Sequence, residues 1–160
     1  MELAAGDPGR AYEAVAEAHE TLAASAETGY LATVVGYQAH AALVLGREDE
    51  ALRLADETRG LAALDDFEPL ARERFVRAQV LAGRGDFTGA DELMADAAEL
   101  VEPTEWLSLH IELALARAEV AHLAGRLEEE REALELAVSL AEAKGNVVAA
   151  ERARARLASL

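Results

Sequence analysis

The segment Arg84-Gly85-Asp86-Phe87-Thr88-Gly89-Ala90 decides the fold, because it places a glycine five residues before a small residue that opens a helix. The same spacing recurs at Gly6–Ala11, Gly46–Ala51 and Gly125–Glu130. The helix-opening positions 11, 51, 90 and 130 therefore lie 40, 39 and 40 residues apart. A fixed period of this size is typical of helical repeat proteins, in which each unit buries its apolar face against its neighbours.

Apolar side chains follow each helix-opening position at offsets 3, 4, 7 and 10 or 11. These offsets fall on one face of a helix and predict the second helix of a helix pair. We expect the first helices over residues 31–45, 70–84 and 104–124. A small residue seven positions before each turn glycine marks the closest approach of the two helices in a pair: Ala39, Ala78 and Ala118.

Several residues at the expected helix ends have defined roles. Glycine just past a helix suits the left-handed conformation that ends it, and Asp49, Asp86 and Asn146 are candidates to cap the helices that follow. Glu130 departs from the pattern of a small residue at the helix opening. It indicates either a register shift towards Ala133 or a functional carboxylate.

The repeat predicts an all-α, right-handed solenoid of antiparallel helix pairs. We expect units at about 1–28, 29–66, 67–102 and 103–144, followed by a capping helix over 146–160. The first unit lacks its first helix, so we expect a C-terminal fragment of a longer protein; the alternative is a complete small protein with a frayed start. A truncated first unit exposes an apolar face that could pair with a second copy to form a homodimer.

The composition agrees with a helical, cytoplasmic protein. Apolar residues make up 52% of the chain and aromatic residues only 4%, and alanine and leucine are strong helix formers. The absence of cysteine excludes disulfides and thiolate metal sites, which suits a reducing cytoplasm. No apolar run reaches the roughly 18 residues of a membrane span, and the start lacks a signal-peptide layout.

The net charge of −16 is distributed unevenly along the chain. Residues 86–142 carry −12, whereas residues 143–160 carry +3. An acidic body repels phosphate backbones, so we expect no direct binding of nucleic acid and favour a basic peptide or a basic protein face as the partner. The alternative is that the acidic surface serves only solubility.

The chain offers no recognisable catalytic motif. It has no phosphate-binding Gly-x4-Gly-Lys-Ser/Thr loop and no Gly-x-Ser-x-Gly elbow. Its four histidines, His19, His40, His110 and His122, show no spacing typical of zinc ligands. We therefore expect neither an enzyme nor a protein with a bound cofactor or metal.

The inner wall of a helical array is lined by the first helix of each pair, and its mixture of aromatic, polar and charged side chains suits a peptide-binding groove. For Tyr37, Phe75 and Leu115 the alternative is ordinary packing between helices, and for His40 and His122 it is a surface or partly buried position. The candidate groove residues are Tyr37, His40, Leu43, Arg72, Phe75, Gln79, Glu112, Leu115, Glu119 and His122.

The pattern small–x6–Gly–x4–Ala resembles the core of tetratricopeptide repeats, and residues 84–90 match it best. The period of about 40 departs from the usual 34 or so. Units of this length are similar to the superhelical domain of large ATP-dependent transcription activators. They also resemble the C-terminal repeats of actinobacterial regulators that carry a cyclase or AAA-ATPase module, especially over residues 142–150.

This resemblance implies a non-catalytic interaction or scaffold module in a multidomain signalling or transcription-regulatory protein. Its partner would be a protein segment in the groove, or the upstream ATPase or cyclase domains of the same chain. The alternative that the resemblance implies is a domain that senses a small effector. The identity of the partner or effector does not follow from the sequence.

Overall fold

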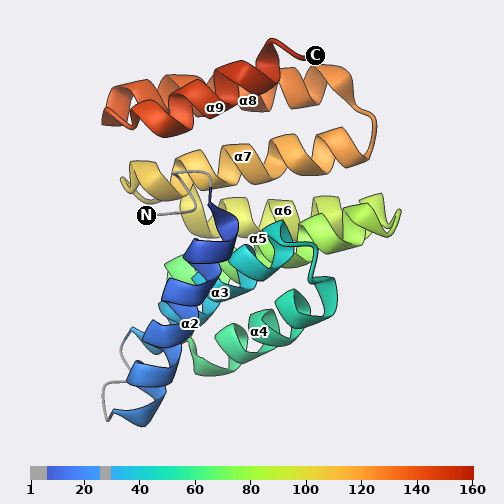
Figure 1. The fold of residues 1–160 in the computed structure, drawn as a ribbon. Helices are drawn as coiled ribbons and strands as arrows, with labels where there is room; N and C mark the ends of the chain where they lie inside the picture. The colour runs from blue at the N-terminus through green and yellow to red at the C-terminus, as the bar shows by residue number, and fades with distance from the viewer. Residues whose placement is uncertain (1–6, 26–29) are drawn as a thin grey trace.

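A computed structural model describes residues 7–25 and 30–160, and all regular secondary structure in these ranges is helical. The first turn glycine, Gly6, lies outside the described residues. Consecutive helices are joined by short loops and form a stack with a repeat-like arrangement (Figure 1). The described helices are α2 (Pro8–Ala24), α3 (Leu31–Val44), α4 (Glu48–Leu61), α5 (Phe67–Gly83), α6 (Phe87–Val101), α7 (Leu107–Leu123), α8 (Leu127–Lys144) and α9 (Val147–Leu157).

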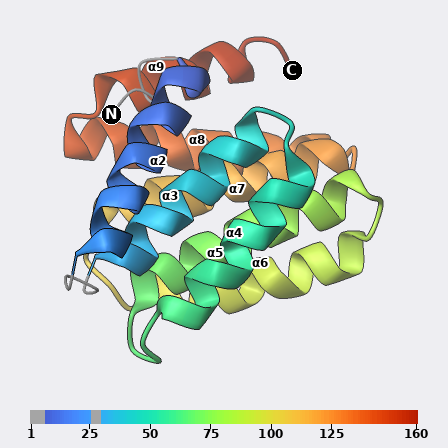
Figure 2. The ribbon, with the colours of Figure 1, turned by 60° about the horizontal axis from the view of Figure 1, so that its bottom comes forward.

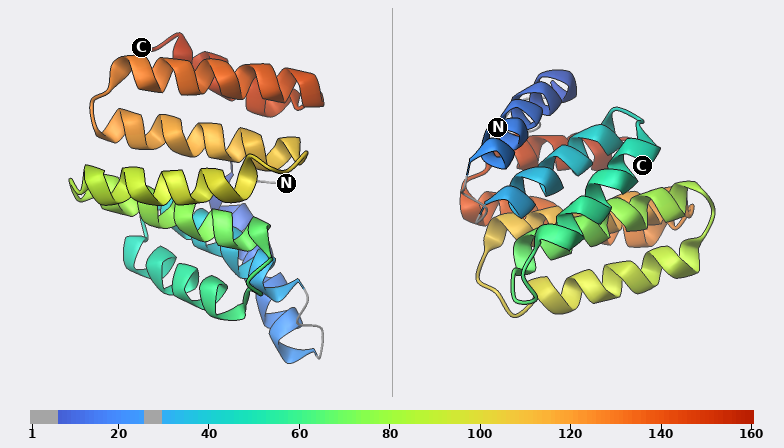
Figure 3. Two further views of the ribbon diagram at one scale, coloured as in Figure 1. Left: turned by 180° about the vertical axis from the view of Figure 1, so that it is seen from behind. Right: turned by 90° about the horizontal axis from the view of Figure 1, so that it is seen from below.

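The helices pack as three antiparallel pairs with one further helix at each end. The pairs are α3 with α4, α5 with α6, and α7 with α8. The first helices of the pairs contact one another in order, so α5 lies between α3 and α7 (Figure 3). Helix α2 lies along α3 (Figure 2), and α9 packs on α8. The all-α class is thus confirmed, while the unit boundaries and the capping role of residues 146–160 stay predictions.

The turns within the pairs depend on glycine, as the sequence predicts. Gly46, Gly85 and Gly125 have φ of 74°, 85° and 68°, a left-handed conformation that disfavours residues with a Cβ atom. At the end of α5 the Asp86 N–H donates to the carbonyl of Leu81 at 2.9 Å. This bond satisfies a carbonyl that the end of the helix leaves without a partner and turns the chain towards α6.

Two of the three predicted helix caps are confirmed. The carboxylate of Asp86 accepts a hydrogen bond from the N–H of Gly89 at 3.0 Å, and Asn146 accepts one from the N–H of Ala149 at 3.2 Å. The prediction for Asp49 was wrong, because α4 already begins at Glu48. Asp49 therefore lies inside the first turn, where its negative charge favours the helix dipole.

The expected starts of two first helices were also displaced. Helix α5 begins at Phe67 instead of residue 70, and α7 begins at Leu107 instead of residue 104. The hydroxyl of Thr104 donates to the carbonyl of Val101 at 2.8 Å. This bond holds the residue in the turn after α6, so α7 starts later. At α7 the predicted boundary was wrong because a side chain competes with the helical hydrogen bonds.

Alanines are buried at the positions where the pairs were expected to approach most closely. Ala39, Ala78 and Ala118 are fully buried, and the positions before the turn glycines are therefore occupied as predicted. A core cluster between α5, α6 and α7 includes Phe75 and Met94. Because such cores are densely packed, a larger side chain at an alanine would cost about 1–3 kcal/mol.

Glu130 occupies the register that the repeat assigns to a small residue. Its side chain is 2% exposed, in the position where Ala51 and Ala90 are fully buried, and Ala133 is only partly buried. The expected shift towards Ala133 is therefore wrong. The reason is that Arg156 and His122 compensate the buried carboxylate of Glu130, as described below. No helix in the described ranges is long and apolar enough to cross a membrane.

Candidate functional site

The predicted site residues lie on α3, α5 and α7, and Arg72 joins two of these helices. Its side chain is 1% exposed. The guanidinium donates from Nε and Nη2 to one oxygen of Glu112 on α7, at 3.1 and 2.8 Å. Nη1 donates to Glu68, one turn earlier on α5, at 3.2 Å. Two carboxylates thus share one buried cation between neighbouring helix pairs.

Tyr37 connects this ion pair to α3. The guanidinium carbon of Arg72 lies 3.8 Å from the centre of the Tyr37 ring, a cation–π arrangement. The Tyr37 hydroxyl donates to Glu68 at 3.4 Å. Burial is the main cause that raises the pKa of Tyr37 to about 12, so the phenol stays protonated at neutral pH. We call Tyr37, Glu68, Arg72 and Glu112 the Arg72 cluster.

The Arg72 cluster favours the charged form of Arg72. Burial acts to lower the pKa of Arg72, but the nearby carboxylate of Glu112 and the other negative neighbours outweigh burial and raise it. A buried cation without a partner would be costly, whereas this one is hydrogen-bonded on both sides. The cluster therefore fixes α3, α5 and α7 relative to one another.

His40 lies one turn beyond Tyr37 on α3 and is neutral. Burial lowers its pKa; the charge of Glu112 acts in the opposite direction, and the charges of Arg72 and Arg152 lower it further. A neutral imidazole can donate a hydrogen bond from one ring nitrogen and accept one at the other. His40 is partly buried, so it can contact a ligand only along its exposed edge.

A second ionic cluster joins α9 to α7 and α8. Arg156 donates to Glu119 at 2.7 Å and to Glu130 at 2.8 Å, and its remaining nitrogen reaches the carbonyl of Ala118 at 3.2 Å. The ring of His122 lies 3.0 Å from the other oxygen of Glu130. We call Glu119, His122, Glu130 and Arg156 the Arg156 cluster. It explains how a carboxylate can occupy a position that is apolar in the other pairs.

The pKa of Glu130 reflects these contacts. Burial by itself raises the pKa, but the hydrogen bonds from His122 and Arg156 outweigh burial and lower it below its ordinary value. Glu130 is therefore ionised at neutral pH. Its carboxylate is a structural anchor for α9 and has no free surface for a ligand.

The structure separates the ten predicted groove residues into four groups. Tyr37, Arg72 and Glu112 meet in the Arg72 cluster, and Glu119 and His122 meet in the Arg156 cluster. Phe75 is 4% exposed and belongs to the core, in agreement with the packing alternative. The remaining residues are partly buried: His40, Leu43, Gln79 and Leu115.

One polar side chain on each first helix occupies the same repeat position. His40, Gln79 and Glu119 each lie six residues before the turn glycine of their pair. All three are partly exposed, and their helices are direct neighbours in the stack. We call these three residues the polar row. It presents an imidazole, an amide and a carboxylate from successive units.

Sequence reasoning missed Glu68, Glu130 and Arg156 as members of these clusters. A signal for Glu68 existed, because it lies four residues before Arg72 on one helix, where opposite charges pair. Arg72 and Glu112 also carry opposite charges at the same repeat position, 40 residues apart. Arg156 gave no comparable signal, since its partners depend on how α9 packs.

Both clusters join side chains from different helices. Among the described residues, no group of three or more histidine or acidic side chains could hold a metal ion. The chain matches no protein-family model, and no curated protein or solved structure is significantly similar to it.

Proposed function

We propose that the chain is a non-catalytic interaction module that binds a segment of a partner protein along the face of α3, α5 and α7. One observation carries the proposal: the polar row of His40, Gln79 and Glu119 repeats one partly exposed polar group on each first helix. Repeat arrays bind partners over such surfaces because each unit adds an equivalent contact. A right-handed, tetratricopeptide-like solenoid is the repeat type that we propose.

The chemistry of the polar row defines the segment that it would bind. Gln79 can both donate to and accept from a peptide backbone, and neutral His40 can do the same. Glu119 is an acceptor suited to a lysine or arginine, although Arg156 already binds one of its oxygens. The partner segment is therefore polar with at least one basic residue.

Rigidity supports binding at this face. The buried Arg72 joins α5 to α7 through hydrogen bonds of 2.8 and 3.1 Å to Glu112, and its cation–π contact with Tyr37 adds α3. A surface that is already ordered loses little conformational entropy when a ligand binds. We propose that the Arg72 cluster orders the surface, while the polar row contacts the partner.

The place of the module in a larger regulatory protein rests on its resemblance to regulator repeats alone. We propose a cytoplasmic signalling or transcription-regulatory protein as its setting. Docking onto an ATPase or cyclase domain would use the same face. The absence of cysteine supports a reducing compartment.

Chemical crosslinking and affinity capture test the proposal. The variant His40→Ala/Gln79→Ala removes two members of the polar row, and Thr88→Ala/Ser139→Ala removes two exposed polar groups on α6 and α8 as a matched control. We expect a partner that crosslinks to the wild type and the control but not to the row variant. Equal capture by all three folded proteins, checked by circular dichroism, would contradict a role for this face.

A further inference from the structure

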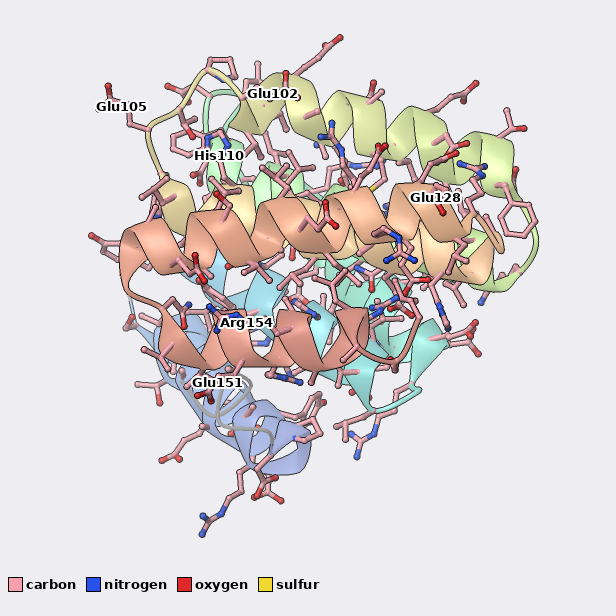
Figure 4. All side chains as sticks on the ribbon, turned by 90° about the horizontal axis from the view of Figure 1, so that it is seen from above. Glu102, Glu105, His110, Glu128, Glu151 and Arg154 are labelled. Carbon is pink, nitrogen blue, oxygen red and sulfur yellow. The ribbon has the colours of Figure 1, made fainter. Side chains whose placement is uncertain are left out.

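A groove lies away from the polar row, between α6 and α8 with α7 as its floor. It has a volume of about 420 Å³, within the range of roughly 300–1,000 Å³ typical of ligand pockets. Figure 4 looks onto α8, with Glu128 on α8 and Glu102 at the end of α6. The groove is lined by Asp91, Met94, Ala95, Arg117, Val120, Ala121, Arg126, Glu129, Glu132, Ala133 and Leu136.

The deepest part of the groove is apolar, and its two walls carry apolar residues that are exposed to solvent. Met94, Val120 and Ala121 form the floor and are 3–5% exposed. Leu136 on α8 is 47% exposed, and Ala95 faces it from α6 as an exposed residue. An exposed leucine beside a recess can bind an apolar side chain of a partner, because covering the leucine removes apolar surface from water.

An arginine fixes one end of the groove. Arg126 donates to both oxygens of Asp91 on α6, at 2.9 and 2.8 Å, and to Glu129 on α8 at 3.3 Å. These bonds connect the start of α8 to α6 and fix the spacing of the two helices at this end of the groove. The recess is therefore present before any partner binds.

The two helices that form the walls of the groove are acidic, and α6 carries four carboxylates and no basic residue. Residues 86–142, which span α6 to most of α8, carry −12. This net charge already counts Arg117, Arg126 and Arg131, each of which pairs with a carboxylate. In the described ranges, five exposed carboxylates of α6 and α8 have no basic partner. Glu132 lines the groove, and the other four lie elsewhere on the same two helices: Glu92, Asp96, Glu99 and Glu135.

We propose that this groove is a second docking site, for a cationic amphipathic helix of a partner protein. The exposed carboxylates of α6 and α8 select lysine or arginine, and the apolar floor selects a leucine-like side chain. The lining of α8 runs from Glu129 to Leu136, about 10 Å along the helix axis. That length accommodates two side chains spaced four residues apart on a helix lying parallel to α6 and α8.

The probe is a fluorescein-labelled helical peptide of about 14 residues, rich in lysine and alanine, with two leucines four residues apart. A second peptide has alanine in place of both leucines. Binding is followed by fluorescence anisotropy at about 0.1 M salt, where long-range attraction is largely screened. We expect the leucine peptide to bind at least about tenfold more tightly, because only its leucines enter the groove.

The substitution Leu136→Glu distinguishes peptide binding in the groove from binding by charge attraction alone. The substitution adds a negative charge and removes the apolar wall, so the proposal predicts about tenfold weaker binding whereas pure charge attraction predicts equal or tighter binding. Ala95→Glu tests the opposite wall in the same way. Leu64→Glu is the matched control, because Leu64 is fully exposed outside the groove, and we expect it to bind as the wild type does.

Three outcomes would overturn the proposal. The first is equal binding of the leucine and alanine peptides, and the second is undiminished binding by folded Leu136→Glu and Ala95→Glu proteins. The third is self-association of the chain without peptide that Leu136→Glu abolishes, measured by light scattering, which would make a second copy the occupant of the groove. The polar-row variant should bind the peptide normally, so this test is independent of the proposed function.

Discussion

Replacing Glu130 with alanine tests whether the Arg156 cluster holds α9 in place. Alanine is the residue at the equivalent positions Ala51 and Ala90, so the pattern of the repeat alone would predict a neutral or stabilising change. The structure predicts the opposite. Glu130→Ala removes two bonds from Arg156, at 2.8 and 2.7 Å, and the 3.0 Å contact with His122.

The magnitude follows from these contacts. A hydrogen bond to a charged group contributes about 1.5–3 kcal/mol. The side chain of Arg156 is 29% exposed and keeps its bond to Glu119, so water and the remaining partner recover part of the loss. We expect Glu130→Ala to lower the free energy of unfolding by about 2 kcal/mol. Glu130→Gln keeps the shape of the side chain and should lose about half as much.

Urea unfolding followed by circular dichroism measures the change. Because an array can unfold locally from one end, amide exchange of α9 should be measured as well, and we expect it to rise by about 30-fold. Glu132→Ala on the exposed side of α8 is the control and should stay within about 0.5 kcal/mol of the wild type. In a double-mutant cycle, Glu130→Ala and Arg156→Ala should couple by about 1–2 kcal/mol. A stabilising Glu130→Ala, or additive single changes, would refute the reasoning.

Three further predictions concern pH, the turns and the Arg72 cluster. In the folded protein the pKa of Glu130 is below its ordinary value of 4.5, so ionised Glu130 stabilises the fold fully above about pH 4.5, and this stabilisation is lost as the pH falls through the folded pKa. The urea midpoint of Glu130→Gln should therefore fall less steeply below about pH 5 than that of the wild type. Parallel curves would contradict this. Gly85→Ala should lose about 1 kcal/mol, whereas Gly83→Ala inside α5 should gain about 0.4–1 kcal/mol in the same urea assay; both sites have free space for a Cβ, so equal effects would show that φ is not the cause. Arg72→Leu should cost about 3 kcal/mol, because it leaves two carboxylates without their shared cation, and a neutral result in thermal unfolding would show that the cluster does not hold the helices.

Much of the fold could be predicted from the sequence because the signals are local. A glycine with positive φ, an aspartate that caps the next helix and an apolar stripe all act within a few residues of one another. Gly85 and Asp86 show this directly, since each has the conformation or bond that its residue type favours. The buried alanines seven residues before the turns follow from the same local periodicity.

The candidate site could be predicted only in part. The sequence placed Tyr37, Arg72 and Glu112 on one wall, and the structure brings these three together. It could not show that Phe75 would be buried, because the exposure of a side chain depends on which neighbouring unit covers it. It also gave no reason to connect Arg156 with Glu119, a residue 37 positions earlier.

The sequence by itself determined the helical class, the repeat period and the positions of the turns. These properties depend on the backbone preferences of single residues and on the spacing of apolar side chains. Only the tertiary structure decided that Glu130 stays in register and that α6, α7 and α8 line one groove. The physical reason is that a buried charge is stabilised by its partners in space, and helix packing determines which distant residues become those partners.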